Sequence, residues 1–374
     1  MANTNLRSAK RQKNDEFYTQ YSDIQKEINA YLEYDPNVFR DKIILLPCDD
    51  PEWSNFTKFF AQNFENFGLK KLISTSYAYE AKIKKYGQLD LFNDTDYITA
   101  NQNFKPEFDK QRGKIFTLTR RNKRVDINDL RWNYLNGDGD FRSDEVKQLR
   151  DESDFIITNP PFSLFREFIS WVFESDKQFL TIGNINAISY KENFPYLKNN
   201  RMWLGVTGFM SDMVFQVPKG TEITPNDKKK AEKLGYVGDY TRIGNSCWFT
   251  NIDHGRRHKP LQLLTIEDNI RFNKKLKGSN YKKYDNYDAL EIPYVELIPS
   301  DYPDLMGVPI TFLDKYNPDQ FEIIGFFNGY SPDAVTEGCI YGSPVSISTS
   351  QSLFRGPVVD GKAKYFSGSL PNWR

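Results

Sequence analysis

The chain has 374 residues and a mass of 43.7 kDa, which is enough for two compact domains and excludes a single small module. Hydrophobic residues make up 39% of the chain and charged residues 27%, so a packed core is expected and long disorder is not. Lys and Arg together number 50 and so do Asp and Glu, and a net charge of zero would ordinarily argue against a polyanionic partner.

Short apolar runs recur along the first half of the chain, with helical patterns between them. Such runs suit strands that are covered on both faces of a sheet, and the patterns between them suit amphipathic helices. Their alternation predicts an α/β fold with a doubly wound sheet. The expected strands span 42–46, 71–75, 115–119, 154–158 and 178–182, and the expected helices span 54–66 and 164–174.

The third of these runs has a second interpretation: the run 115–119 and the basic residues after it could equally form a hairpin inserted before the fourth strand.

The later part of the chain differs from the first half in its sequence pattern. Residues 202–217 and 246–252 alternate in polarity, which predicts antiparallel strands at the far edge of the sheet. From about Asp253 onward prolines recur and no helical period is sustained, so this part is expected to be rich in loops and strands.

The charge is distributed unevenly along the chain. Residues 1–200 hold 29 basic and 30 acidic side chains, residues 201–284 hold 16 and 8, and residues 285–374 hold 5 and 12. In the basic block, aromatic residues interleave with positive charge, as a nucleic-acid surface requires, although a solvated charged face is the alternative. Its clusters contain Lys228, Lys229 and Lys230, Arg256 and Arg257, and Lys274 and Lys275.

Several site types are not supported. The three cysteines lie far apart without CxxC spacing, so neither a disulfide framework nor a zinc site is expected. The two histidines, His254 and His258, flank basic residues in a segment that reads as solvated, which makes a histidine metal site or nucleophile triad unexpected. The polar N-terminus and the lack of a long apolar stretch predict a soluble, cytoplasmic protein that has no membrane partner.

One tetrapeptide carries the chemistry: Asn159, Pro160, Pro161 and Phe162, directly after the expected strand 154–158. Ligands bind at the carboxyl ends of strands in a doubly wound sheet, so the loop is well placed for a site. Prolines lack an N–H, so the backbone offers acceptors, and Asn159 adds a side-chain carbonyl. Two fixed oxygens could accept both hydrogens of an NH₂ group while Phe162 stacks on a planar ring. An ordinary turn is the plainer alternative.

This motif resembles the catalytic motif of amino-methyltransferases that use S-adenosylmethionine. Segments 14–20, 46–56 and 306–312 occur in the matching order. Together they make the chain similar to the EcoRI-type adenine-specific DNA methyltransferase family, with a γ-like motif order. The resemblance implies a Rossmann-like methyltransferase domain over 1–252 and a strand- and loop-rich DNA target-recognition region over 253–374, with the basic block beginning near residue 201.

The resemblance also implies where the cofactor would bind. The loop 48–50 contains no glycine where most methyltransferases have a GxG loop, and the EcoRI-type family is expected to carry such an acidic version. An acidic side chain could hold the cofactor's ammonium, and the start of the following helix could hold its carboxylate. The matching residues are Phe17, Tyr18 and Thr19 near the methionine end, Pro47, Asp49, Ser54, Asn55 and Phe56 after the first strand, and Asp140 and Phe141 near the adenine.

The implied reaction is direct methyl transfer to N6 of an adenine that is flipped out of double-stranded DNA, without a metal ion. A cognate restriction endonuclease would be a functional partner and not a physical one. Two alternatives stay open: an amino-methyltransferase that acts on a protein glutamine or on RNA, and a non-catalytic DNA-binding relative. A nuclease is disfavoured because no carboxylate pair with a nearby lysine has the spacing of a metal site.

Overall fold

The computed structural model describes residues 17–78, 105, 108, 111–120, 130–207, 213–217, 221, 223–276, 279–284 and 288–324, and the backbone of 358–359 and 362–363. Over these residues the chain is a mixed α/β protein with two compact units. The larger unit holds the described residues up to Asn193 together with Met202–Gly255, and the smaller holds Phe194–Arg201 and those from Arg256 onward. The domain boundary expected after residue 252 stays a prediction. None of the described helices has the length and apolar character of a membrane span.

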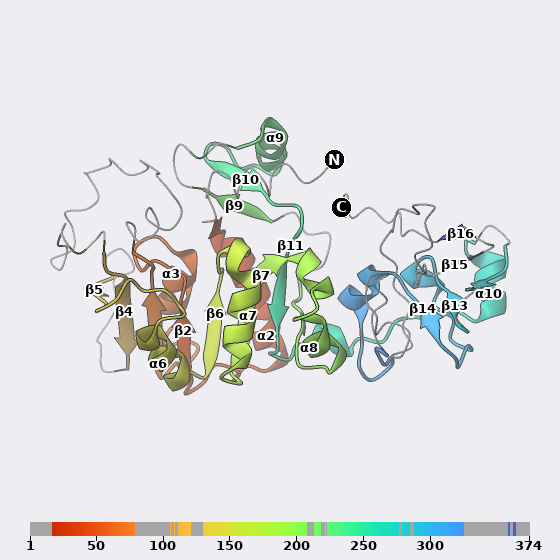
Figure 1. Ribbon diagram of the computed structural model, residues 1–374, viewed down its shortest axis with the longest axis horizontal. Helices are drawn as coiled ribbons and strands as arrows, with labels where there is room; N and C mark the ends of the chain where they lie inside the picture. Colours follow the sequence, from red (N-terminus) through yellow and green to blue (C-terminus); the bar gives the residue numbers. More distant parts are fainter. Residues whose placement is uncertain are drawn as a thin grey trace, which may run out of the picture. The chain divides into compact units, whose positions relative to one another are not determined.

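A mixed sheet forms the centre of the larger unit (Figure 1). Its four middle strands run parallel, and antiparallel strands flank them on both sides. Among the described residues its spatial order is β5 (Asn133–Tyr134), β4 (Lys114–Thr119), β3 (Lys71–Thr75), β2 (Ile43–Leu46), β6 (Phe155–Thr158), β7 (Gln178–Asn184), β11 (Ser246–Thr250) and β8 (Trp203–Leu204).

The five strands expected from apolar runs all form. β4 pairs antiparallel with both β3 and β5, so of the two alternatives for this run the structure favours the hairpin-like one over the parallel array. The alternating segment 202–217 is not one strand: β8 joins the large sheet, whereas β9 (Val214–Gln216) pairs elsewhere. Alternating polarity predicts that a strand has one buried face, but it does not indicate which sheet the strand joins.

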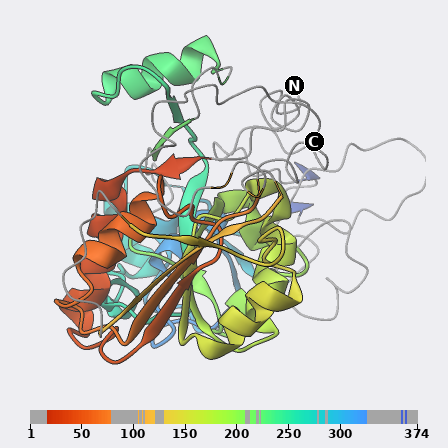
Figure 2. The same ribbon diagram turned by 90° about the vertical axis from the view of Figure 1, so that its left-hand side faces the viewer.

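Helices cover both faces of the sheet (Figure 2). α2 (Tyr21–Tyr34) and α3 (Asn55–Gln62) pack an aromatic-rich core against β2 and β6, including Tyr31, Phe59 and Phe155. On the other face lie α6 (Asp144–Glu152) and α7 (Phe165–Phe173), which are joined by a 2.7 Å hydrogen bond from Arg150 to the Trp171 carbonyl. This enclosure explains why every residue of β6 is buried and why its sequence is apolar.

A small second sheet lies above the edge at which the parallel strands end (Figures 1 and 2). It consists of β1 (Tyr18–Thr19), β9 and β10 (Tyr240–Arg242), and α9 (Pro225–Lys233) packs on β10. β1 pairs antiparallel with β9, with Thr19 opposite Phe215. The N-terminal strand is therefore held by a segment almost two hundred residues later in the sequence.

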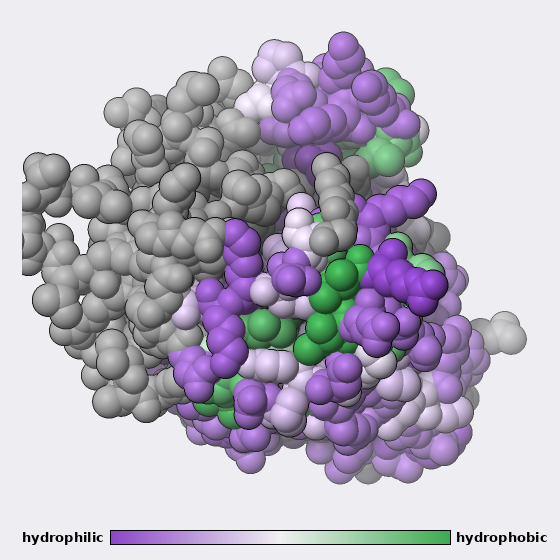
Figure 3. Space-filling view, turned by 90° about the vertical axis from the view of Figure 1, so that its right-hand side faces the viewer, coloured by the Kyte–Doolittle hydropathy of each residue, from purple (hydrophilic) through white to green (hydrophobic). Residues whose placement is uncertain are grey.

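The smaller unit has its own apolar core, which includes Ile292, Leu297 and Phe312. Figure 3 shows hydrophobic residues exposed among hydrophilic ones on one face. Unlike the expectation of loops and strands alone, this unit contains an α-helix, because Thr265 caps it and acidic residues follow in the first turn. Its described elements are α8 (Phe194–Lys198), η3 (Gly255–His258), α10 (Ile266–Phe272), β12 (Lys282–Lys283), β13 (Leu290–Glu291), η4 (Val295–Leu297), β14 (Met306–Gly307), η5 (Ile310–Lys315), β15 (Val358–Val359) and β16 (Lys362–Ala363).

The packing of α7 on β7 makes Gly183 sensitive to substitution. A Cβ at this position would overlap the Phe165 ring, whereas a Cβ at Gly137 would meet only Glu145 Oε2 at 3.5 Å. We expect Gly183→Ala to lower the free energy of unfolding by about 1–3 kcal/mol, because overpacking displaces the ring. Gly137→Ala is the control, and urea unfolding measures both. Equal stability of the two variants would contradict the close packing.

Candidate active site

The expected catalytic tetrapeptide lies at the carboxyl end of β6, in the middle of the parallel strands. Pro160 is buried, and the Pro161 carbonyl accepts from Leu164 N at 2.9 Å, which begins η1 (Phe162–Leu164). The rigid Pro-Pro turn thus leads directly from a buried strand into a helical segment. This is the edge at which ligands bind in open α/β sheets.

The side chain of Asn159 has one occupied end and one open end. Its Nδ2 donates to the Phe17 carbonyl at 2.6 Å. Its Oδ1 is buried, and no described residue donates to it. Because a carbonyl can only accept, Phe17 determines which end of the amide faces it, and Oδ1 is left as an oriented acceptor. A buried acceptor without a donor is costly unless a ligand supplies one.

Three aromatic rings meet beside Asn159. The rings of Phe17 and Phe162 are stacked at 5.6 Å between centroids, with planes 28° apart. Phe215 of β9 meets both rings edge-on, at 5.9 Å from Phe17 and 6.3 Å from Phe162. The expected motif residues Phe17 and Phe162 are therefore brought together, and Phe215 joins them.

β1 is held over the sheet from two sides. Asn55 at the start of α3 donates through Nδ2 to the Thr19 carbonyl at 2.8 Å, and β9 pairs with β1 along its other edge. The Thr19 hydroxyl is buried without a partner among the described residues. Like Asn159 Oδ1, it is a polar atom available to a ligand.

Asp49 lies at the centre of a buried hydrogen-bond network that joins the strand ends. Its carboxylate accepts from Ser54 Oγ at 2.6 Å and from Thr158 Oγ1 at 2.5 Å. Its carbonyl accepts from Ser74 Oγ at 2.5 Å. Ser54 also caps α3 by accepting from the Phe56 N–H at 3.0 Å. The network thus connects the loop after β2 with the ends of β3 and β6 and with the start of α3.

The Asp49 side chain is a carboxylate in a site with little water, since the residue is 5% exposed. Burial raises the pKa of Asp49 to about 7, although the hydroxyls of Ser54 and Thr158 oppose the rise. The following acidic residues are partnered: Lys114 lies 3.8 Å from the Asp50 carboxylate and 2.5 Å from that of Glu52. The acidic loop therefore contains one inward, shielded carboxylate beside two that a lysine neutralises.

The residues expected near a cofactor adenine have partners within the chain. The Asp140 carboxylate accepts from Arg142 Nε at 2.9 Å and from Arg142 Nη2 at 2.7 Å. Phe141 is buried, and its ring lies 5.4 Å from that of Phe168 and 5.5 Å from that of Trp171. The Asp138 carbonyl accepts from Ala78 N at 2.7 Å, so this loop lies beside the end of β3.

The expected DNA-binding residues fall in different units. Lys228, Lys229 and Lys230 belong to α9 of the larger unit, and the first two are exposed. In the smaller unit Arg256 pairs with Asp314 at 2.7 Å, Arg257 is buried and bonds to Asn200, and Lys275 pairs with Glu296. Lys274 is exposed. Of these seven expected residues, all of which the structure describes, Lys228, Lys229 and Lys274 are exposed and lie outside the pairs named here.

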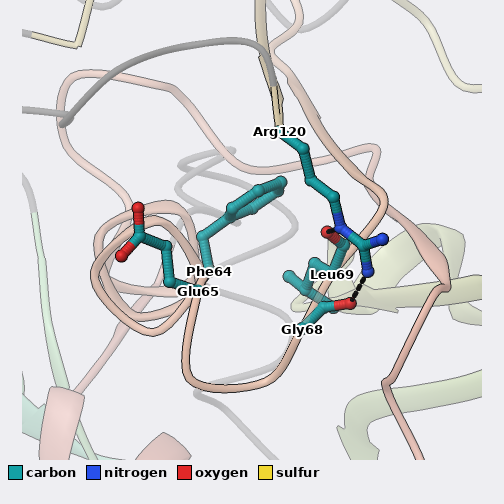
Figure 4. Close-up of a pocket in the computed structure, with 5 residues that line it drawn as sticks. All are labelled: Phe64, Glu65, Gly68, Leu69 and Arg120. Carbon is teal, nitrogen blue, oxygen red and sulfur yellow. Dashed lines mark hydrogen bonds between the residues drawn. The ribbon is translucent and has the colours of Figure 1, made fainter.

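A shallow cavity of about 230 Å³ lies at the opposite edge of the large sheet, before β3 and after β4 (Figure 4). Arg120 covers it by donating to the carbonyls of Leu69, at 3.0 Å, and Gly68, at 2.5 Å. Since it lies away from the carboxyl ends of the parallel strands, it is not part of the candidate site. No group of His, Cys, Asp and Glu among the described residues could hold a metal ion.

Two contributors were not identified from the sequence. Thr158 ends an apolar strand immediately before the motif, and a lone hydroxyl at a strand end is a signal that could have been used. Phe215 gave no such signal, because its contact with Phe17 depends on the pairing of β1 with β9.

Comparison with known proteins identifies the family. The family model described as "Adenine-specific methyltransferase EcoRI" matches residues 5–366. The Type II methyltransferase M.EcoRI of Escherichia coli is 42% identical over 327 residues, covering 87% of this chain and 89% of the relative. The Type II methyltransferase M.MpnI of Mycoplasma pneumoniae is 34% identical over 319 residues, covering 84% and 83%. No solved structure matches.

The fold and the family match define a methyltransferase that is specific for adenine. The chain belongs to the EcoRI family of adenine-specific DNA methyltransferases. The resemblance expected from the motifs at 14–20, 46–56, 159–162 and 306–312 is confirmed. Methyltransferases of this kind generally take their methyl group from S-adenosylmethionine, and DNA is the substrate that the family implies.

The pKa of Asp49 makes stability depend on pH. An Asp carboxyl in an unfolded chain has a pKa of about 4. In the folded protein the Asp49 carboxyl binds its proton more tightly than in the unfolded chain, and this adds to the free energy of unfolding. The contribution is complete below about pH 4 and is lost as the pH rises through about 7. We expect the free energy of unfolding of the wild type to fall relative to that of Asp49→Asn by up to about 1.4 kcal/mol per pH unit in this window.

Denaturant unfolding at a series of pH values measures this difference. Asp151→Asn, at a carboxylate that is 61% exposed, is the matched control and should follow the wild type. Parallel profiles for the wild type and Asp49→Asn would show that the buried carboxyl does not titrate in this range.

Proposed function

We propose that the protein transfers a methyl group from S-adenosylmethionine to N6 of an adenine that is flipped out of double-stranded DNA. The observation that carries this proposal is the orientation of Asn159: its Nδ2 is bound by the Phe17 carbonyl, and its buried Oδ1 lacks a donor among the described residues. The adenine N6 amine would be that donor. The motif then acts as an acceptor pair, made of Asn159 Oδ1 and the Pro160 carbonyl.

These two acceptors would orient the amine for transfer. Each would accept a hydrogen bond from one N–H of the amine. The nitrogen lone pair would then be drawn out of conjugation with the ring and directed toward the methyl group. Both acceptors are held by a buried strand and two prolines, so they need not reorganise during the reaction. Positioning and fixed electrostatics would account for the acceleration.

The aromatic rings beside Asn159 would receive the flipped base. Taking an adenine out of the duplex costs a few kcal/mol, and a stacking partner offsets part of this cost. Phe162 is the proposed partner, since it is half-buried at the start of η1 and lies three residues after Asn159. Phe17 stacks on Phe162, so a base and Phe17 would compete for one face or share the two faces of that ring.

Some residues present at this edge fit S-adenosylmethionine. The methyl donor supplies an electrophilic methyl group on a sulfonium. Thr19 offers a buried hydroxyl to which no described residue is hydrogen-bonded. The start of α3, which follows the loop 47–49, lies next to Thr19 through the bond from Asn55 to the Thr19 carbonyl. We assign Phe17, Tyr18, Thr19, Pro47, Ser54, Asn55 and Phe56 to the methionine side, and Asp140 and Phe141 to the adenine side.

Asp49 fits this assignment in a different way from the one expected. Both of its carboxylate oxygens already accept from hydroxyls of the chain, and the residue is 5% exposed. We therefore assign it to shaping the loop more than to direct contact with the ammonium. The four parallel strands and the helices on both faces support the doubly wound, Rossmann-like interpretation of the larger unit.

We assign DNA contacts to the basic block, with the strand- and loop-rich region after residue 253 selecting the site. Lysines on α9 would neutralise phosphates near the target base, because α9 packs on β10 in the sheet that carries Phe215. As a Type II relative, the enzyme would protect host DNA from a cognate restriction endonuclease. A protein-glutamine or RNA substrate is disfavoured by the family match over residues 5–366.

Asn159→Ala tests the proposed role of the amide. We expect methyl transfer to DNA to fall by at least about 10²-fold, because a preorganised acceptor is lost. Cofactor affinity should be retained, since Asn55 and β9 still hold β1. The exposed Asn199→Ala is the control.

Tritium transfer from labelled cofactor measures the rate, and single-molecule sequencing of DNA from cells that express each variant reports the modified base and its site. Undiminished transfer by Asn159→Ala would refute the role of Asn159. If DNA from cells that express the wild-type protein carried no modified adenine, the proposed reaction itself would be refuted.

Replacing Lys228, Lys229 and Lys230 by Ala tests the role of α9. The logarithm of DNA affinity falls linearly with the logarithm of salt concentration, and each lost phosphate contact should flatten the slope by about one. The control replaces the exposed lysines Lys26, Lys70 and Lys191. Fluorescence anisotropy with duplex DNA measures both slopes. An unchanged slope in the α9 variant would remove these lysines from the DNA surface.

A further inference from the structure

A buried carboxylate outside the sequence motifs accepts four hydrogen bonds on the helix that follows β1. Glu27 of α2 is fully buried. It accepts from Val206 N at 2.7 Å, from Thr207 N at 2.9 Å and from Thr207 Oγ1 at 2.7 Å, and Tyr31 OH donates to it at 3.0 Å. Burial raises the pKa of Glu27, while these four donors oppose the rise.

The backbone around these donors is shaped for the carboxylate. A Cβ on Gly205 would overlap Glu27 Oε1 and lie 2.6 Å from the Trp248 Cβ, so only glycine allows this close approach. Gly205 N is itself bound to the Trp248 carbonyl at 2.9 Å. Successive N–H groups that converge on one anion form a backbone nest, which is stronger than a single hydrogen bond.

Described elements link Glu27 to Phe215 through α2. Glu27 holds residues 206 and 207, and β1 and β10 pair with residues 214–216. α2, which carries Glu27, follows β1 after a single residue, and its Ile24 and Ile28 belong to the same buried cluster as Phe215. Strand pairing therefore fixes Phe215 beside β1, and Glu27 fixes the helix that packs in the same core.

We propose that Glu27 is a positioning residue for methyl transfer, which sets the place of Phe215 against Phe17 and Phe162. This inference rests on the proposed function. A hydrophobic side chain of similar shape would avoid the cost of burying a carboxylate, but it would leave the Val206 and Thr207 donors unsatisfied. Loss of the carboxylate frees α2 from residues 206 and 207, while Asp49, Asn55 and Thr19 keep their own contacts. The stacked base is then affected, and the cofactor is not.

Glu27→Gln tests this inference, because the amide keeps the shape but presents an NH₂ group to N–H donors. Thr207→Val is a milder second variant that removes only the hydroxyl bond. Glu33→Gln, at an exposed position of the same helix, is the matched control. The probe is a duplex with the methylation site found by sequencing and 2-aminopurine at the target adenine.

We expect Glu27→Gln to lower kcat by about tenfold to a hundredfold and to reduce the 2-aminopurine fluorescence change on binding. Thr207→Val should act in the same direction to a smaller extent, and cofactor affinity should stay at the wild-type value in both. If Glu27→Gln does not fold, Thr207→Val decides. The inference is overturned if kcat and fluorescence match those of Glu33→Gln, or if cofactor affinity falls by the same factor as kcat. A wild type that leaves adenine unmodified would instead refute the proposed function.

Discussion

The carboxylate of Asp49 is the point on which the candidate site is assembled. It accepts from Ser54, which caps α3, and from Thr158, which precedes Asn159. One side chain thereby links the loop proposed for the cofactor with the turn proposed for the methyl acceptor. The hydroxyl donors hold these parts together through hydrogen bonds, and burial of the carboxylate raises the pKa of Asp49 to about 7.

Hydrogen bonds from short polar side chains also hold the segment 17–19 at the site. Asn55 and Asn159 each donate an amide hydrogen to a carbonyl of the segment 17–19, so two motifs hold a third between them. In the proposed cofactor site, short polar side chains with fixed partners would take the place of the glycine-rich loop that is common in other methyltransferases. An acidic loop without glycine would then still build a binding edge.

Much of the architecture could be predicted from the sequence. Continuous apolar runs gave the five strands, because strands covered on both faces carry no polar alternation. The sequence left two alternatives open for β4 and did not reveal the separation of β8 from β9, since both depend on pairing between distant segments. For the site, Asn159 and Phe162 follow from local composition, whereas Glu27 and Phe215 depend on contacts across more than 170 residues. The zero net charge concealed a basic block, of which Arg256, Arg257 and Lys275 are engaged within their own unit.

The position of β1 has a consequence for biosynthesis. Residues 17–19 leave the ribosome before all of their partners, which are Asn55, Asn159 and the strand at 214–216. Contacts between such distant segments close late, because a long loop must be ordered before they form. In an incomplete nascent chain, residues 17–19 therefore lack the partners that hold them at the site. The enzyme becomes competent only once its larger unit has been synthesised.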